Sequence, residues 1–159
     1  MIFGQAPGVV EGEERRPWRG RAGRTLRRWL ELEEDAFYEI FYCASVTRCY
    51  PGRGASGRGD RTPTSREIAL CRFWRERELS LLRPRLLVPV GGLAARELLG
   101  VRSVSDFVGR TYELDGAVAI PLPHPSGASS WSNDAANRAQ LEGALALVRA
   151  ELRVLAAAG

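Results

Sequence analysis

The chain has 159 residues, of which 45% are hydrophobic and 26% are charged, and it carries a net charge of +4. This composition is typical of a folded globular protein, and the length suffices to bury a core, so we expect one domain over residues 1–159. No apolar run approaches the roughly 20 residues that cross a bilayer, and residues 1–5 show no signal-peptide pattern. We therefore expect a cytoplasmic protein with no membrane partner.

All 23 basic residues are arginines. A Schiff base requires an amine, so only the Met1 amino group is available for that chemistry. A modest positive charge suits a polyanionic partner such as nucleic acid, although many basic proteins bind none. The three cysteines, Cys43, Cys49 and Cys71, are too few for a four-thiolate metal site, and their odd number argues against a disulfide framework.

Short apolar runs alternate with helical patterns along the chain. In chain order we predict a strand over 1–3, a helix over 22–34, a strand over 41–47, a helix from 65, a strand over 86–90, a helix over 93–99, a strand over 117–122 and a long final helix. The strands are continuously apolar, as expected when both faces of a parallel sheet are covered. This order predicts an α/β fold, a three-layer α/β/α sandwich with a short, mainly parallel four-stranded sheet.

Two helices have recognisable starts. Thr64–Glu67 matches a capping box. The residues expected to share the buried face after it are Ile68, Cys71, Leu79 and Leu82. The final helix is expected to be capped by Ser132 or Asn133, and its apolar stripe consists of Leu141, Leu145, Val148, Leu152 and Leu155.

Arg48–Thr62 is the longest irregular stretch and is rich in glycine and arginine. Within it, Gly52–Gly57 matches G-x-G-x-x-G, but its surroundings do not predict the strand-to-helix turn of a dinucleotide site. We interpret the stretch as a mobile basic loop that approaches phosphates, or as a plain exposed loop.

Ligands of open α/β sheets bind at the carboxyl ends of the strands. Unusual residues follow three of the predicted strands, and they carry four motifs: Gly4-Gln5-Ala6-Pro7-Gly8 with Glu11, Pro17-Trp18-Arg19-Gly20 with Ala22-Gly23, Arg48-Cys49-Tyr50-Pro51, and His124-Pro125-Ser126. In these motifs and their order the chain resembles the uracil-DNA glycosylase superfamily, particularly its thermostable iron–sulfur branch. The resemblance spans nearly the whole chain and implies a partner DNA with a damaged base flipped into a pocket.

The resemblance implies a role for each motif. His124, the only histidine, would stabilise the leaving base and Trp18 would stack on it; the alternatives are an ordinary loop histidine and a core tryptophan. The residues expected to border the base are Gly4, Gln5, Ala6, Trp18 and Ser45. The residues expected to contact DNA are Pro7, Gly8, Arg48, Ser126, Gly127, Ser129 and Trp131, the last as a minor-groove wedge or as a packing residue.

The chain departs from the family pattern at three places. Ser45 stands where the branch has an Asn that reads uracil through paired hydrogen bonds, so we expect altered base selectivity. Ala6 stands where other branches orient the attacking water, which leaves Gln5 or Glu11 for that task, unless Glu11 is an ordinary exposed residue. Only Cys49 and Cys71 match the four cluster ligands, because the chain begins on the first strand; we expect no cofactor, unless the native start lies upstream.

The sequence thus predicts a monomeric DNA glycosylase of base excision repair that removes a deaminated base, and uracil is the base expected. Because lysine is absent, the enzyme is expected to be monofunctional and to leave an abasic site. The alternatives are a glycosylase for hypoxanthine or xanthine, a catalytically silent DNA-binding relative, and an α/β protein unrelated to DNA.

Overall fold

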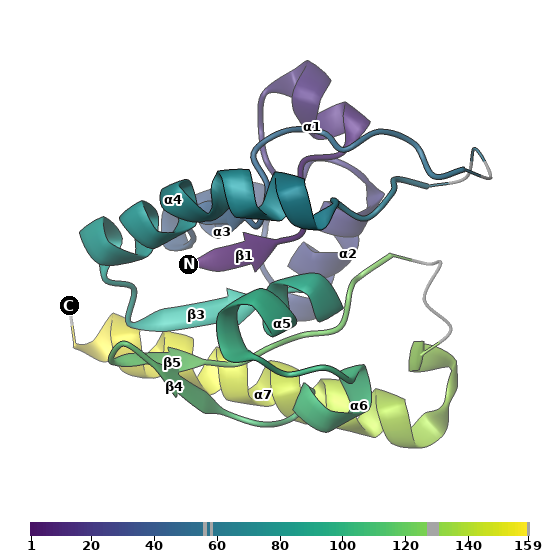
Figure 1. The fold of residues 1–159 in the computed structure, drawn as a ribbon. Coiled ribbons are helices and arrows are strands. Elements are labelled where there is room, and N and C mark those ends of the chain that lie inside the picture. The colour runs from purple at the N-terminus through teal and green to yellow at the C-terminus, as the bar shows by residue number, and fades with distance from the viewer. Residues whose placement is uncertain (56, 58, 127–130, 159) are drawn as a thin grey trace.

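The computed structural model describes residues 1–55, 57, 59–126 and 131–158. Within this part of the chain, a five-stranded sheet has the order β2-β1-β3-β5-β4. Figure 1 labels β1, β3, β5 and β4 in this sheet. The strands are β1 (Ile2–Gly4), β2 (Cys43–Ser45), β3 (Leu86–Pro89), β4 (Tyr112–Leu114) and β5 (Ala117–Ala119). β1 pairs in parallel with β2 and β3, and β3 pairs in parallel with β5.

The four predicted strands are all present, but the predicted strand number is wrong by one. β4 pairs antiparallel with β5 through a two-residue loop, Asp115 and Gly116, whose φ angles of 49° and 82° are both positive. An Asp-Gly pair favours this kind of hairpin loop. The dipeptide was therefore the sequence signal for the edge strand that the prediction lacked.

The helices cover both faces of the sheet. They are α1 (Val9–Glu14), α2 (Arg21–Leu30), α3 (Glu34–Ile40), α4 (Ser65–Leu82), α5 (Gly92–Leu99), α6 (Val104–Phe107) and α7 (Ala135–Ala157), with a 3-10 turn at Trp131–Asn133. Among the helices of the described residues, no segment combines the length and apolarity that a membrane span requires.

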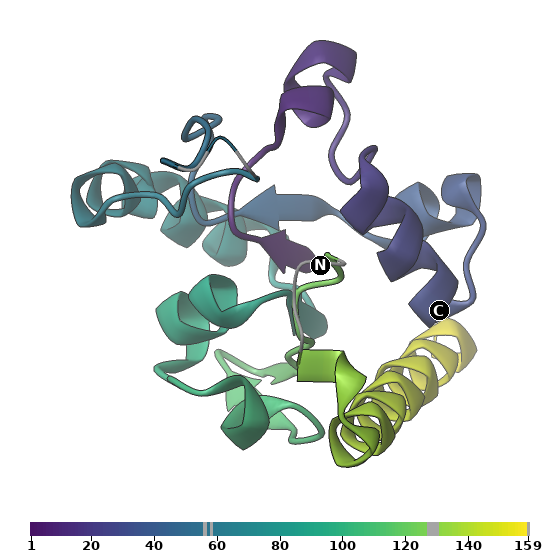
Figure 2. The same ribbon diagram turned by 90° about the vertical axis from the view of Figure 1, so that its right-hand side faces the viewer.

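Alternate strand residues point into two separate cores. Ile2 and Val88 pack with α2, α3 and α7 on one face, whereas Phe3 and Leu87 pack with α4 and α5 on the other. Figure 2 shows the two helical layers on opposite sides of the sheet. The predicted three-layer α/β/α architecture is confirmed, and α1 lies outside it, with no buried residues.

Two predicted helix boundaries are wrong. The helix expected over 22–34 ends earlier, at Leu30, because Glu31 adopts a left-handed φ of 57°. The next helix, α3, begins only at Glu34 and was not predicted. The final helix is capped by Asp134, whose carboxylate accepts from the amides of Ala136 and Asn137. Ser132 and Asn133 do not cap it because they belong to the preceding 3-10 turn.

The capping box at the start of α4 is confirmed: the Thr64 side chain accepts from the amide of Glu67, whose carboxylate accepts from the Thr64 amide. The predicted buried face holds for Ile68 but not for Leu82, which is 46% exposed. Leu82 is the last residue of α4, and the chain turns away at Arg83, in a left-handed conformation, toward β3. The stripe of α7 is confirmed, with Leu141, Leu145 and Val148 buried.

Candidate active site

A cavity of about 350 Å³ opens at the carboxyl ends of β1 and β2, beside the segment that follows β5. Three separate chain segments meet there, as the strand-end argument predicts. The predicted site residues that line the cavity are Gly4, Gln5, Ala6, Pro7, Gly8, Glu11, Trp18, Ser45, Arg48 and His124. An adjoining groove of about 530 Å³ shares Pro7, Gly8 and His124 with the cavity and is also lined by Ser126.

His124 lies directly after a segment that is bound to the end of β3, and its ring packs on Gly91. The amide of Gly91 donates to the carbonyl of Leu122, which fixes the segment leading to His124 beside the end of β3. A Cβ on Gly91 would lie 3.2 Å from Cδ2 of the imidazole, and the φ of Gly91 is +90°. Glycine is therefore required at this position, because it lets the ring pack directly on the backbone.

The imidazole has a defined hydrogen-bond polarity. Its Nδ1 accepts from the amide of Ser126 at 3.3 Å, so in the neutral ring Nε2 carries the proton. Desolvation by the surrounding protein atoms lowers the pKa of His124 below its ordinary 6.5, even though the side chain is exposed to the cavity. At neutral pH the ring is therefore an uncharged hydrogen-bond donor.

Trp18 adopts a left-handed conformation with a φ of 58°, and its indole lies against the end of β1. A Cβ on Gly4 would lie 3.0 Å from Cζ2 of the indole, and a Cβ on Gly23 would lie only 1.7 Å from the Trp18 carbonyl oxygen. These two glycines of the sequence motifs therefore make room for Trp18. Its ring packs against the buried core and also lines the cavity, so the core contact is present, while the stacking role stays a prediction.

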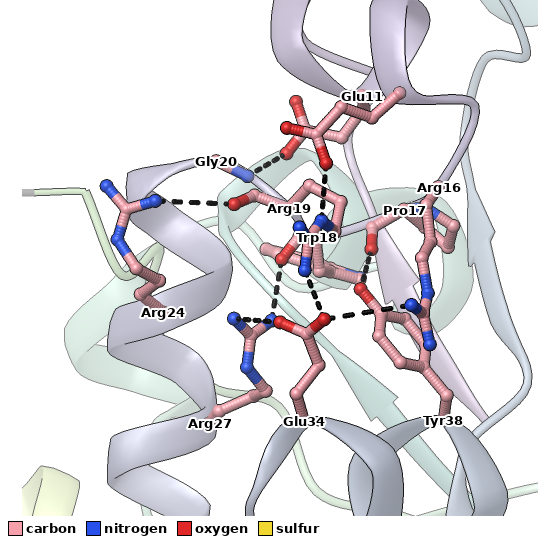
Figure 3. A network of polar contacts seen from close by, with 11 residues as sticks. Glu11, Arg16, Pro17, Trp18, Arg19, Gly20, Arg24, Arg27, Glu34 and Tyr38 are labelled. Carbon is pink, nitrogen blue, oxygen red and sulfur yellow. Dashed lines mark hydrogen bonds and ion pairs between the residues drawn. The ribbon is translucent and has the colours of Figure 1, made fainter.

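Glu11 connects the first two helices. Its Oε1 accepts from the amide of Gly20 at 2.7 Å, and Gly20 is the N-cap of α2 (Figure 3). A carboxylate at this position satisfies an amide that has no partner within the helix and interacts favourably with the helix dipole. A Cβ on Gly8 would lie 2.6 Å from Oε2 of Glu11, so both glycines accommodate this carboxylate. The contact indicates a structural task for Glu11.

Ser45 and Arg48 border the cavity, but each already has a partner. The hydroxyl of Ser45 donates to the carbonyl of Thr47 at 2.7 Å, which leaves the oxygen to face a ligand as an acceptor. The guanidinium of Arg48 forms an ion pair with Glu78 of α4. These two partners therefore fix where the Ser45 hydroxyl and the Arg48 guanidinium lie at the edge of the cavity.

Asp60, Arg15 and Arg16 also line the cavity, although none of them belongs to a sequence motif. The loop that carries Asp60 folds back on itself, since the amide of Arg61 donates to the carbonyl of Gly52 at 2.9 Å. One oxygen of Asp60 accepts from the hydroxyl of Tyr50 at 3.0 Å. The sequence signal that could have indicated Asp60 is that it is the single acidic residue of the arginine-rich stretch Arg48–Thr62.

The remaining predicted DNA contacts divide into two groups. Trp131 packs against the core, and its indole nitrogen donates to the hydroxyl of Ser105 at 3.0 Å, which favours the packing role over the wedge. Gly127 and Ser129 lie outside the described residues.

The cysteines do not assemble a metal centre in the described part of the chain, where no group of three or more His, Cys, Asp or Glu side chains could hold a metal ion. Cys49 is exposed and Cys71 is half-buried, with its sulfur accepting from the amide of Arg48 at 3.5 Å. Cys43 is separate, and burial raises the pKa of its thiol to about 12. The residues present therefore do not fit a cluster that needs four thiolates.

Comparisons with known proteins identify the family of the chain. A sequence model of the uracil DNA glycosylase superfamily matches residues 1–149. The chain is 30% identical over 118 residues to a type-4 uracil-DNA glycosylase of Pyrobaculum aerophilum, covering 71% of this chain and 57% of the relative. It is 31% identical over 129 residues to the type-4 uracil-DNA glycosylase of Thermotoga maritima, covering 79% of this chain and 64% of the relative.

The chain therefore spans less than two thirds of the length of these two relatives. The family match covers all strands of the sheet and every residue that lines the cavity. On this match, the chain belongs to the uracil-DNA glycosylase superfamily.

Proposed function

We propose that the chain is a monofunctional DNA glycosylase that hydrolyses the N-glycosidic bond of a flipped deaminated base, as a step of base excision repair. Uracil is the substrate that we propose first. The observation that carries the proposal is that Trp18 and the donor imidazole of His124 border one cavity at the sheet edge. An aromatic ring and a hydrogen-bond donor at one cavity are suited to holding a base and stabilising its departure.

The reaction breaks the bond between the sugar C1′ and the base nitrogen, and the electron pair leaves with the base. Negative charge then develops on the base, including its O2. The Nε2–H of His124 donates to that oxygen, and the bond strengthens as the charge grows. A water oxygen forms the new bond to C1′, and its released proton neutralises the base anion. The products are the free base and an abasic site.

Water positioning is assigned here to side chains at the cavity. Gln5, Glu11 and Asp60 all line it. Glu11 already accepts a hydrogen bond from the amide of Gly20. We therefore favour Asp60 for positioning the water: its Oδ1 accepts from Tyr50, and its Oδ2 is the oxygen that would bind the water. Gln5 is the uncharged alternative.

Base selectivity is expected to depend on Ser45. Because its hydroxyl proton is directed to the carbonyl of Thr47, Ser45 offers an acceptor to an N–H of the base but no donor to the neighbouring carbonyl. This observation favours relaxed selectivity, so hypoxanthine or xanthine is the second candidate substrate. Ser45→Asn supplies both a donor and an acceptor and is expected to raise uracil excision relative to hypoxanthine excision. An unchanged ratio would show that Ser45 does not read the base.

The monofunctional assignment follows from the absence of lysine. The amine of Met1 donates to the carbonyl of Leu86 at 2.6 Å, at the start of β1 and thus away from the cavity. We further propose a monomer that works without a metal cofactor, because one chain supplies all the groups proposed for the reaction. A cytoplasmic location is proposed as well, since a DNA glycosylase must reach its DNA. Pro7, Gly8 and Ser126 are the proposed phosphate contacts along the adjoining groove.

The test is incubation with oligonucleotides that contain uracil, hypoxanthine or xanthine, followed by alkaline cleavage of abasic sites. Release of a base with cleavage only after alkali is the expected result. Cleavage without alkali would contradict the monofunctional assignment. Salt-dependent binding to duplex DNA without release of any base would instead identify a catalytically silent DNA-binding protein.

A further inference from the structure

The loop that carries Trp18 is fixed at three successive residues (Figure 3). The hydroxyl of Tyr38 donates to the carbonyl of Pro17 at 2.5 Å. Nη1 of Arg27 donates to the carbonyl of Trp18 at 2.8 Å. The guanidinium of Arg19 forms an ion pair with Glu34. All three anchors belong to α2, α3 or the loop itself, so these two helices determine where the loop lies.

Arg27 is the central anchor. The residue is only 8% exposed, and its Nη2 lies 3.0 Å from Oε2 of Glu34 while Nη1 binds the Trp18 carbonyl. Removing a guanidinium from water is costly unless its donors are paired. Here the two terminal nitrogens are used for different partners, one carboxylate and one backbone oxygen of the loop. The planar fork of arginine suits this geometry, and a lysine ammonium lacks it.

The conformation of Trp18 explains why such an anchor is needed. A φ of 58° is unfavourable for a residue with a side chain, and it persists only when the surroundings fix it. Gly23 leaves space for the Trp18 carbonyl, and Arg27 binds that carbonyl in this space. Without the bond, we expect the backbone of Trp18 to relax and the indole to leave its place against Gly4.

We propose that Arg27 is a positioning residue, which acts through Trp18 by holding the indole at the angle and depth that a flipped base requires. This inference rests on the proposed glycosylase function, but the position of the indole can be measured without it. Arg27 touches no reacting atom. Its effect on excision therefore depends on the presence of the tryptophan ring.

The first measurement is ¹⁹F NMR of the full chain labelled with 5-fluorotryptophan. The chain has four tryptophans, and the Trp18 signal is assigned by its loss in Trp18→Phe. Arg27→Met is expected to move the Trp18 signal and to leave the signals of the other tryptophans in place. Arg28→Met, which removes an exposed arginine from the next position of α2, is expected to move none of them. A Trp18 signal that Arg27→Met does not move would overturn the inference. Should Arg27→Met not fold, Arg27→Lys takes its place, with the same outcomes deciding.

The second measurement is single-turnover excision in a double-mutant cycle. Arg27→Met is expected to slow excision on the order of tenfold to a hundredfold, as a small misplacement of a binding group does, whereas Arg28→Met changes it by less than about twofold. In the Trp18→Ala background, Arg27→Met is expected to add less than about twofold, because the two residues act as one unit. An equal loss in both backgrounds would mean that Arg27 supports the fold rather than Trp18.

The two proposals can fail separately. If the wild type releases no base but its Trp18 signal depends on Arg27, the glycosylase function fails and the positioning role stands. If base is released but the Trp18 signal is indifferent to Arg27, the positioning role fails and the glycosylase function stands.

Discussion

His124→Ala removes the donor on which the proposed chemistry depends. The neutral imidazole is held in place before the reaction, with Nδ1 bound to the Ser126 amide and the ring packed on Gly91. A preorganised donor of this kind is worth about 2.7–4 kcal/mol in the transition state, or on the order of 10²–10³ in rate. We therefore expect the rate of base release to fall by that factor.

The assay is single-turnover release of uracil from a labelled oligonucleotide, compared with the Kd for the same sequence carrying an uncleavable 2′-fluoro deoxyuridine. The Kd is expected to change by less than about threefold, because the hydrogen bond is weak before charge develops on the base. Equal rates for the wild type and His124→Ala would refute the role of His124. A Kd that weakens as much as the rate falls would show that His124 binds the ground state instead.

Three further predictions follow from buried groups and glycines. Because desolvation lowers the pKa of His124, the unfolded chain takes up a proton there before the native chain does as the pH is lowered. The free energy of unfolding should therefore fall as the pH is lowered from about 7.5 to 5.5, and it should fall less in His124→Asn. Identical pH profiles of the two proteins in urea denaturation would contradict this. Gly23→Ala places a Cβ 1.7 Å from the Trp18 carbonyl oxygen and should lower the free energy of unfolding by about 3 kcal/mol. Gly12→Ala, with open space around it, should raise the free energy of unfolding by about 0.5 kcal/mol or leave it unchanged, and thermal denaturation measures both. Iodoacetamide at pH 8 should label exposed Cys49 first and Cys43 last, because burial raises the pKa of the Cys43 thiol to about 12. Mass spectrometry of tryptic peptides gives the order of labelling, and early labelling of Cys43 would contradict its burial.

The architecture could be predicted because each of the four predicted strands is a continuous apolar run. Ile2 and Phe3, adjacent in the sequence, face opposite cores, and this is the pattern that a sheet covered on both sides requires. The interruptions were harder to see. Glu31 ends α2 earlier than predicted through its backbone conformation, which no periodicity of apolar residues reports, and α3 after it was not predicted. β4 is a short edge strand with mixed exposure and therefore lacked an apolar run.

The position of the site was predictable, because strand ends in a parallel sheet lie on one edge and the motifs follow those ends. The roles of individual residues depended on contacts across the chain. Glu11 was read as a catalytic candidate from its place in a motif, but its carboxylate binds an amide nine residues away. Asp60 was overlooked because it lies in a loop without periodicity, although folding of that loop brings it to the cavity.

Three glycines, of which Gly4 and Gly23 belong to the sequence motifs, have a common physical explanation that the sequence alone did not give. Gly4, Gly23 and Gly91 were placed near a base or phosphate, or left without a role, by the sequence analysis, yet each contacts protein: the first two accommodate Trp18, and the third accommodates His124. A Cβ would press on the Trp18 indole at Gly4, on the Trp18 backbone at Gly23 and on the His124 imidazole at Gly91. These three glycines therefore help to specify where Trp18 and His124 lie. For the same reason, a chain of this family that keeps Trp18 and His124 but replaces Gly23 is expected to lose the cavity, while the residues that would touch the base are unchanged.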